Sequence, residues 1–362
     1  MTHTFKQAFK QSFTQSFNGT ALTSALLIST AIALPTAALA DTGYMTKTIS
    51  VPHREAPVRL DIYYPAEAGG QTTLHGKNAV FTGIEISADG KPMAGKHPVV
   101  IFSHGSGVNG INTGWMGKAL ADQGIIMIAP NHPGTTSRDS HPEDTVKTWE
   151  RPQDISSLID QLPKLFAGDM QADTSRIGAV GFSLGGYSVL ALAGAKISKA
   201  AFIEHCDRSM GKGLNECAWI TKDGLDLNDT DQERFEQSNK DPRITTVVSI
   251  DPGLAAAFTP QSLKAMERPV KIINLGSEGT IYAGVDGKPV AADIPNAKYH
   301  TVDKAWHFSF LGTCTPIGAE ILIAEKDDPI CDEKGGRDRA DIHKEIASET
   351  VSFIKQHLAV TN

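Results

Sequence analysis

The sequence lacks several features that would point directly to a class of function. Its formal net charge is −7, so it lacks the basic surface with which nucleic-acid-binding proteins neutralise phosphates. It contains no C-x-x-C or H-E-x-x-H spacing, which argues against a zinc site. It has no internal repeat, and after residue 40 no apolar run is long enough to span a membrane. We therefore expect neither a nucleic-acid partner nor a transmembrane segment after residue 40.

What is present is an ordinary globular composition. The chain has 362 residues, of which 40% are hydrophobic and 21% are charged. This is enough to bury a sizeable core, in one large domain or two small ones.

The first 40 residues differ from the rest of the chain. They carry lysines but no Asp or Glu, then an apolar stretch over 21–34, and they end in Ala-Leu-Ala at Ala40. This order is typical of a secretory signal peptide, and the apolar run is short for the alternative, a membrane anchor. We expect cleavage after Ala40, a single mature domain over 41–362, and a periplasmic or secreted location.

Export affects the interpretation of the four cysteines, Cys206, Cys217, Cys314 and Cys331. An even number of cysteines in an oxidising compartment indicates disulfides. Three pairings are possible, and short loops favour Cys206–Cys217 and Cys314–Cys331.

Short apolar segments alternate with amphipathic ones from residue 97 onward. Such a pattern predicts a mostly parallel sheet covered by helices on both faces, a three-layer α/β/α sandwich. The early part of the chain reads as strands at 46–50, 58–66 and 79–87. The later strands are expected at 98–104, 125–130, 176–182, 244–250, 270–276 and 299–303, and the helices at 115–124, 152–162, 184–195 and 342–358.

The segment 203–243 interrupts this alternation. It is polar, charged and contains two of the cysteines. We interpret it as an insertion over one edge of the sheet. Two interpretations of this segment stay open: a lid over a binding site, and a solvated surface excursion with no role in the site.

The central chemical motif is Gly181-Phe182-Ser183-Leu184-Gly185, a G-x-S-x-G sequence. The motif alone is weak, but here an apolar strand precedes the serine and a helix follows it, which is the context the motif requires. A nucleophilic serine on such a turn takes a strained backbone conformation, and the flanking glycines allow strand and helix to approach closely. Ser183 is therefore the expected nucleophile.

A serine hydroxyl needs a base to accept its proton, and the base needs an acid to orient it. His307 follows the last expected strand and comes after the acid candidates in chain order, as this constellation requires. Asp251 and Glu278 each follow a predicted strand between Ser183 and His307, so either carboxylate is a candidate acid.

An anionic tetrahedral intermediate needs two hydrogen-bond donors. One is the main-chain N–H of Leu184. The other is expected from the loop His104-Gly105-Ser106-Gly107, through the main-chain N–H of Ser106. We interpret His104 as a residue that braces this loop. The mechanism requires no cofactor or metal.

Seven segments occur in an order that resembles a known group: SHGSG, NHPG, RPQDI, GFSLGG, DPRI, SIDPG and KAWHF. The chain resembles bacterial α/β hydrolases related to dienelactone-hydrolase-like proteins and platelet-activating-factor acetylhydrolases, from about Tyr64 to the C-terminus. The resemblance implies that Asp251 rather than Glu278 is the acid, that Ser106 is an oxyanion donor, and that the esters include phospholipid-derived ones.

The expected function is hydrolysis of a small carboxylic ester through an acyl-serine intermediate. Two alternatives stay open. One is an amidase or peptidase on the same fold, and the other is a non-catalytic binding protein that retained it. Labelling by a fluorophosphonate probe separates the last alternative from the enzymes.

Overall fold

The computed structural model describes residues 41–209, 216–221 and 224–360. The expected signal peptide at 1–40 lies outside these residues. No helix within the described ranges has the length and apolar character needed to cross a membrane.

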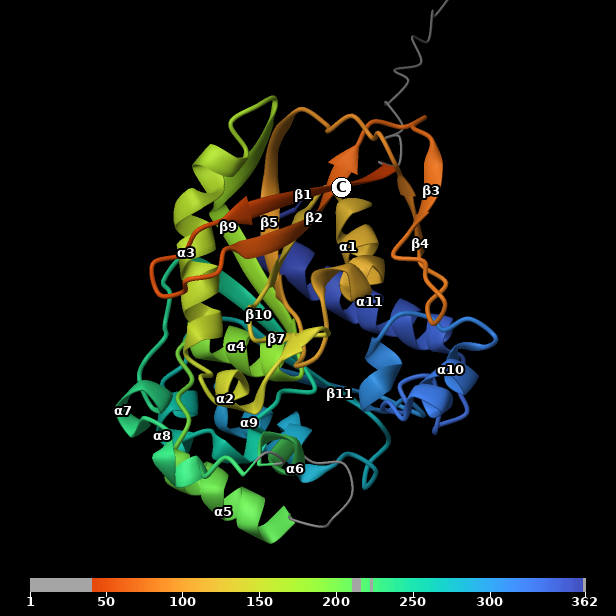
Figure 1. Cartoon of the computed structure of the whole chain (residues 1–362). Helices are drawn as coiled ribbons and strands as arrows, with labels where there is room; N and C mark the ends of the chain where they lie inside the picture. Colours follow the sequence, from red (N-terminus) through yellow and green to blue (C-terminus); the bar gives the residue numbers. More distant parts are fainter. Residues whose placement is uncertain (1–40, 210–215, 222–223, 361–362) are drawn as a thin grey trace, which may run out of the picture. The chain divides into compact units, whose positions relative to one another are not determined.

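A ten-stranded sheet runs through the described residues in the order β12-β11-β10-β9-β5-β6-β2-β1-β4-β3 (Figure 1). Its six strands from β12 to β6 are parallel, and β2 joins β6 in antiparallel orientation. The strands are β1 Asp41–Ile49, β2 Val58–Ala66, β3 Thr72–His75, β4 Ile84–Ser87, β5 Gly95–Ser103, β6 Ile126–Asn131, β9 Met170–Phe182, β10 Ile244–Ile250, β11 Val270–Leu275 and β12 Lys298–Val302, with a separate hairpin of β7 Thr135–Thr136 and β8 Asp139–Ser140.

Helices cover both faces of the sheet, so the expected three-layer α/β/α sandwich is confirmed. The helices are α1 Gly114–Ala121, α2 Pro142–Thr145, α3 Glu150–Leu165, α4 Leu184–Ala193, α5 Lys199–Ser209, α6 Glu216–Ile220, α7 Gln232–Phe235, α8 Pro260–Lys264, α9 Gly287–Asp293, α10 Gly318–Glu325 and α11 Arg339–His357. Apolar side chains of α1 and α11 pack on one face, and those of α3, α4 and α9 pack on the other. Because both faces are covered, β10, β11 and residues 177–182 of β9 are almost entirely buried.

The strand expected at 79–87 is wrong over its first half. Only Ile84–Ser87 is a strand, and the segment before it is a turn. The side chain of Asn78 accepts hydrogen bonds from the main chain of Val80 and Phe81, each at 2.8 Å. Gly83, at a φ of 76°, then changes the direction of the chain. Local turn chemistry therefore overrides the strand propensity of these residues.

The topology gathers loops from distant parts of the sequence at one sheet edge. Strands β10, β9, β5 and β6 are neighbours and parallel, so their carboxyl ends lie together. The residues that follow them, Asp251, Ser183, His104 and His132, are therefore close in space. In an open α/β sheet, this edge is where sites form.

Candidate active site

Ser183 lies in a strained turn between β9 and α4. Its φ is 56° and its ψ is −122°, which is unusual for a residue with a side chain. The turn is held by main-chain hydrogen bonds: Ser183 N–H donates to Ile250 (2.9 Å), and Gly253 N–H donates to the carbonyl of Ser183 (2.8 Å). These contacts with the segment after β10 keep the strained conformation in place.

The glycines on either side of Ser183 are required by close approach. A Cβ on Gly181 would overlap the carbonyl of Gly185, and a Cβ on Gly185 would overlap the carbonyl of Ser103. The first contact lets α4 begin directly against β9, and the second brings its N-terminus against the end of β5. The steric reason for the G-x-S-x-G sequence is thus visible on both sides of the serine.

His307 lies between Ser183 and Asp251. Its Nε2 is 3.1 Å from Ser183 Oγ, and its Nδ1 is 2.8 Å from Asp251 Oδ2. Because a carboxylate can only accept, Nδ1 carries the proton and Nε2 is free to accept from the serine hydroxyl. His307 is buried, and its ring packs beside those of Phe182 and Tyr282.

Asp251 is itself held by neighbours that the sequence motifs did not identify. Its Oδ1 accepts from the main-chain N–H of Leu275 (2.7 Å) and from Asn274 Nδ2 (2.8 Å), which leaves Oδ2 for His307. Asn274 is fixed in turn because Nδ2 also donates to the carbonyl of Val285 (2.7 Å) and Oδ1 accepts from Gly287 N–H (2.8 Å). An Asn directly after the apolar pair Ile272-Ile273, near the end of the strand, was the available signal.

Glu278, the other candidate acid, does not reach His307. Its side chain is 88% exposed and pairs with Lys288 at 2.9 Å. It follows β11, but Gly276 at a φ of 138° turns the chain away immediately after that strand. The structure therefore places Asp251, not Glu278, beside His307.

The loop after β5 lies beside the serine. A Cβ on Gly105 would come within 3.3 Å of Ser183 Cβ and 3.1 Å of the Phe182 ring, so a larger residue here would require these neighbours to shift. Ser106 and Leu184 line the same cavity as Ser183. Within the described residues, the main-chain N–H groups of Ser106 and Leu184 donate to no protein acceptor, as oxyanion donors must.

A cavity of about 1170 Å³ opens over these residues. Ser183 and His307 line it, together with apolar side chains from several parts of the fold. These apolar side chains include Phe202, Ile220, Phe235, Leu254, Phe308 and Leu311. Polar and charged side chains, such as Asn109, Arg138 and Asp327, line other parts of the cavity, so the site combines an apolar wall with a polar one.

The segment 203–243 contributes to this cavity rather than lying apart from it. Its described residues include part of α5 and all of α6 and α7, and these helices lie together at one end of the sheet (Figure 1). The Cys206–Cys217 disulfide joins α5 to α6, while Ile220 and Phe235 line the cavity. A second disulfide, Cys314–Cys331, closes the loop that contains α10, which also borders the cavity. Both disulfides are the pairings that short loops favoured, and they fit an oxidising compartment.

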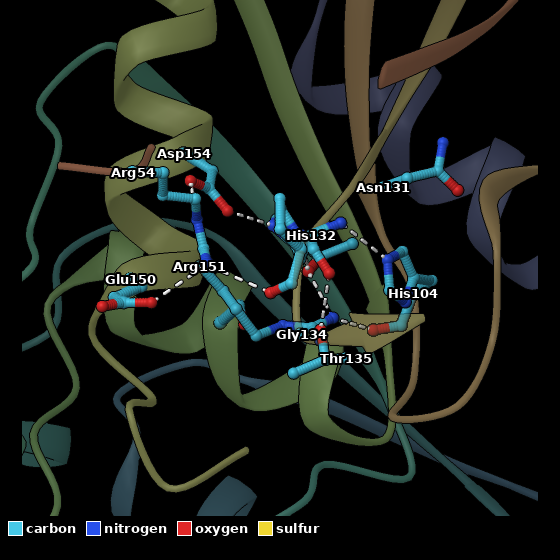
Figure 2. A network of polar contacts seen from close by, with 12 residues as sticks. Arg54, His104, Asn131, His132, Gly134, Thr135, Glu150, Arg151 and Asp154 are labelled. Atoms are coloured by element: carbon cyan, nitrogen blue, oxygen red, sulfur yellow. Dashed lines mark hydrogen bonds and ion pairs between the residues drawn. The ribbon is translucent and has the colours of Figure 1, made fainter. Parts of the chain in front are cut away.

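A buried polar network lies behind the loop of residues 104–107 (Figure 2). His132 is central: its Nδ1 is 2.7 Å from Asp154 Oδ2, its Nε2 is 3.0 Å from Ser103 Oγ, and its main-chain N–H donates to His104 Nε2 at 3.0 Å. Arg151 donates to Ser103 Oγ and to the main-chain carbonyl of His104. Burial, and then the charge of Arg151, lowers the pKa of His132 to about 3, so this ring is neutral at physiological pH.

The charged end of this network was missed in the sequence. Arg151 and Asp154 lie three residues apart in α3, on the same face as its apolar residues Ile155 and Leu158. Charged side chains on the apolar face of a helix must be paired when buried, which was the available signal. Asp154 meets this requirement through Arg54 Nε at 2.7 Å, in addition to His132.

Comparisons with known proteins bear on this site. Residues 112–205 match the model of the Prolyl oligopeptidase family. A dipeptidyl-peptidase 5 from Porphyromonas gingivalis is 31% identical over 118 residues, which are 30% of this chain and 17% of that protein. A ferulic acid esterase from Streptomyces cinnamoneus aligns over 91% of this chain and 93% of its own, with a TM-score of 0.57 and 15% identity. An acylaminoacyl peptidase from Pyrococcus horikoshii covers 90% of this chain and 43% of its own, with a TM-score of 0.46 and 12% identity.

The chain has the α/β-hydrolase fold. The esterase structure shows this fold, and the order of the strands and loops around Ser183 agrees with it. The family match, which includes Ser183, supports a serine hydrolase in this α/β-hydrolase scaffold. Among the residues that the structure describes, no group of three or more His, Cys, Asp or Glu side chains could hold a metal ion.

Proposed function

We propose that this α/β hydrolase cleaves carboxylic esters, with Ser183 as nucleophile, His307 as general base and Asp251 as the residue that orients it. The observation that carries the proposal is the pair of contacts at His307, to Ser183 Oγ at 3.1 Å and to Asp251 at 2.8 Å, at the wall of a large cavity.

In the proposed reaction, His307 Nε2 takes the proton of Ser183 Oγ as the oxygen attacks the ester carbonyl. The carbonyl oxygen becomes an oxyanion, which accepts from the main-chain N–H groups of Ser106 and Leu184. His307 then protonates the departing alcohol and leaves an acyl-serine. A water that gives its proton to His307 attacks this acyl-serine, and His307 returns the proton to Ser183 Oγ as the acid leaves. Asp251 stabilises the imidazolium in both steps.

Part of the cavity wall is apolar, and this part favours an ester over a peptide. A peptide brings main-chain N–H and C=O groups that need partners when they are removed from water. Phe202, Ile220, Phe235 and Leu254 offer none. An ester of a small acid or alcohol with an apolar substituent satisfies this wall without leaving polar groups unpaired.

Cleavage of an amide or peptide is the second candidate. The match of residues 112–205 to the Prolyl oligopeptidase family favours it, as does the similarity of one segment to a dipeptidyl-peptidase. The chemical steps would be the same, and only the leaving group would differ.

The test compares the purified protein with Ser183→Ala on p-nitrophenyl esters from acetate to palmitate and on aminoacyl p-nitroanilides. Ester turnover that depends on Ser183 supports the proposal, and the best chain length measures the apolar pocket. Turnover of anilides alone moves the assignment to the amidase. If the protein turns over none of these substrates and does not react with a fluorophosphonate, the remaining interpretation is a non-catalytic binding protein.

The cellular location of the protein is also a proposal. We propose export with removal of residues 1–40, supported by the two disulfides. Sequencing of the N-terminus of the protein recovered from the periplasm or medium tests this. A mature chain that begins at Asp41 is expected, and an intact Met1 in a membrane fraction would contradict it.

A further inference from the structure

Several hydrogen bonds hold the loop that carries Ser106 in place. The carbonyl of His104 accepts from Arg151, the carbonyl of Gly105 is 2.7 Å from His104 Nδ1, and Gly107 N–H donates to the carbonyl of Thr135 at 2.9 Å. Arg151 also donates to Thr135 Oγ1 at 2.8 Å. The main-chain N–H of Ser106 is left without a protein acceptor in the described part of the chain.

The direction of these bonds determines the tautomer of His104. The main-chain N–H of His132 can only donate, so His104 Nε2, 3.0 Å away, must accept. A neutral imidazole then carries its proton on Nδ1, which donates to the carbonyl of Gly105. Figure 2 shows His132 between Asp154 and His104, so one end of the network is a carboxylate and the other is this ring.

The hydrogen bond from His104 to the carbonyl of Gly105 also fixes the direction of the next main-chain N–H, that of Ser106. The carbonyl of Gly105 and the N–H of Ser106 belong to the same planar peptide unit, and in a trans peptide they point in opposite directions. No peptide bond in the described residues is cis. When His104 Nδ1 holds the carbonyl on its side, the N–H of Ser106 points away from the ring.

We infer that His104 is a positioning residue that aims the main-chain N–H of Ser106 at the oxyanion. The inference rests on the proposed function, because it assigns a task in acyl transfer to this peptide unit. The role needs a neutral ring, since a doubly protonated imidazole cannot accept from His132. His104 is fully buried, and burial followed by the charge of Arg151 holds its pKa well below the usual range.

Two substitutions separate the two hydrogen bonds of His104. In His104→Asn, the amide nitrogen can take the place of Nδ1 and keep the bond to Gly105, while the acceptor for His132 is lost. In His104→Gln, the amide oxygen can take the place of Nε2 and keep the acceptor, while the donor to Gly105 is lost. Glu150→Gln, at the rim of the network where Glu150 pairs with Arg54, is the control.

We expect His104→Gln to lower kcat about 10- to 100-fold on the best ester, because one oxyanion donor is misdirected. KM should change less, since the oxyanion exists only in the transition state. A trifluoromethyl ketone, which forms a tetrahedral adduct with the serine, should bind the variant more weakly by a similar factor. His104→Asn should stay within a few-fold of the wild-type protein, and Glu150→Gln should be unchanged.

The outcomes separate this inference from the proposed function. Inactivity of the wild-type protein on all esters and anilides contradicts the proposed function. Activity of the wild type with equal losses in both His104 variants, or no loss in His104→Gln, overturns the inference. If His104→Gln does not fold, ¹⁵N NMR of the wild-type histidines decides. A ring protonated only at Nδ1 that does not titrate between pH 5 and 8 supports the inference. The Nε2–H tautomer, or titration in that range, overturns it.

Discussion

The molecule contains two Ser–His–Asp sets with nearly the same hydrogen-bond distances. In the first, Ser183 Oγ lies 3.1 Å from His307, which lies 2.8 Å from Asp251. In the second, Ser103 Oγ lies 3.0 Å from His132, which lies 2.7 Å from Asp154. The two sets differ in their access to the cavity and in the charges around them.

Access is the first difference. Ser183 lines the cavity in a strained turn, whereas Ser103, His132 and Asp154 are each 0% exposed. Charge is the second. Arg151 donates to Ser103 Oγ, and with burial it holds the pKa of His132 at about 3, so His132 is a poor proton acceptor at neutral pH. Hydrogen-bond geometry alone therefore does not define an active site; a free approach to the hydroxyl and a base able to accept its proton are also needed.

The largest contrast is expected at the two serines. Ser183→Ala should lower kcat/KM on a p-nitrophenyl ester roughly 10³-fold or more, with an unchanged unfolding midpoint. Ser103→Ala should keep most of the activity and instead lower the free energy of unfolding by about 1–3 kcal/mol, because Arg151 and His132 each lose a buried partner. Steady-state kinetics and urea denaturation of both variants measure the two effects. A folded Ser103→Ala protein as inactive as Ser183→Ala would contradict the structural role assigned to the second set.

The two carboxylates should separate in the same way. Asp251→Asn should lower kcat roughly 10³- to 10⁴-fold while leaving stability nearly intact, because the imidazolium loses its counter-charge. Asp154→Asn should destabilise the protein by about 3–5 kcal/mol, since Arg54 loses its buried anion. Kinetics corrected by active-site titration, together with denaturant unfolding, distinguish the variants. Equal destabilisation by both would remove the distinction.

A smaller effect is expected from the residue that holds Asp251. Asn274→Ala removes the 2.8 Å hydrogen bond to Asp251 Oδ1 and leaves only that from Leu275. A hydrogen bond to a charged group contributes about 1.5–3 kcal/mol, so kcat should fall about 10- to 100-fold. Tyr299→Phe is the matched control, because among the described residues the Tyr299 hydroxyl hydrogen-bonds only to Oδ1 of Asn274, at 3.1 Å. If both variants keep wild-type kcat, Leu275 alone suffices to hold the carboxylate.

The last expected effect is a pH dependence, and it concerns stability rather than catalysis. Burial, and then a neighbouring arginine, lowers the pKa of His132 to about 3 and of His343 to about 4 from an ordinary 6.5, and holds that of His104 well below 6.5. The unfolded chain therefore binds more protons below pH 6.5, and stability falls as the pH is lowered through that value. Each such histidine contributes a slope of about 1.4 kcal/mol per pH unit.

Urea denaturation between pH 7.5 and 4.5 measures this slope. His132→Gln removes one of the three groups, so its stability should be lower at pH 7.5 but should fall less steeply on acidification. The same slope in variant and wild type would mean that His132 is not held neutral.

Some of this arrangement could be predicted from local sequence because its causes are local. The alternation of apolar strands and amphipathic helices predicts a layered α/β fold, since each side chain position is set by the period of its own element. The turn at Ser183 could be predicted for the same reason, because Gly181 and Gly185 relieve overlaps with residues that must lie close to any such turn. Where a local turn competed, as at Asn78, the strand expected from propensity was wrong.

The partners of these residues depend on tertiary structure. Asp251 and Glu278 both follow strands, and local pattern left both open as the acid; the fold brings Asp251 to His307 and leaves Glu278 on Lys288 at the surface. Two histidines separated by 175 positions, His132 and His307, each join a serine to an aspartate, and only burial and the reach of Arg151 make their chemistry different.

The sequence by itself thus determined the layers of the fold and the turn at Ser183, because these follow from neighbours along the chain. The tertiary structure decided which of two similar constellations meets a cavity, because exposure and charge come from elements that the chain order does not bring together.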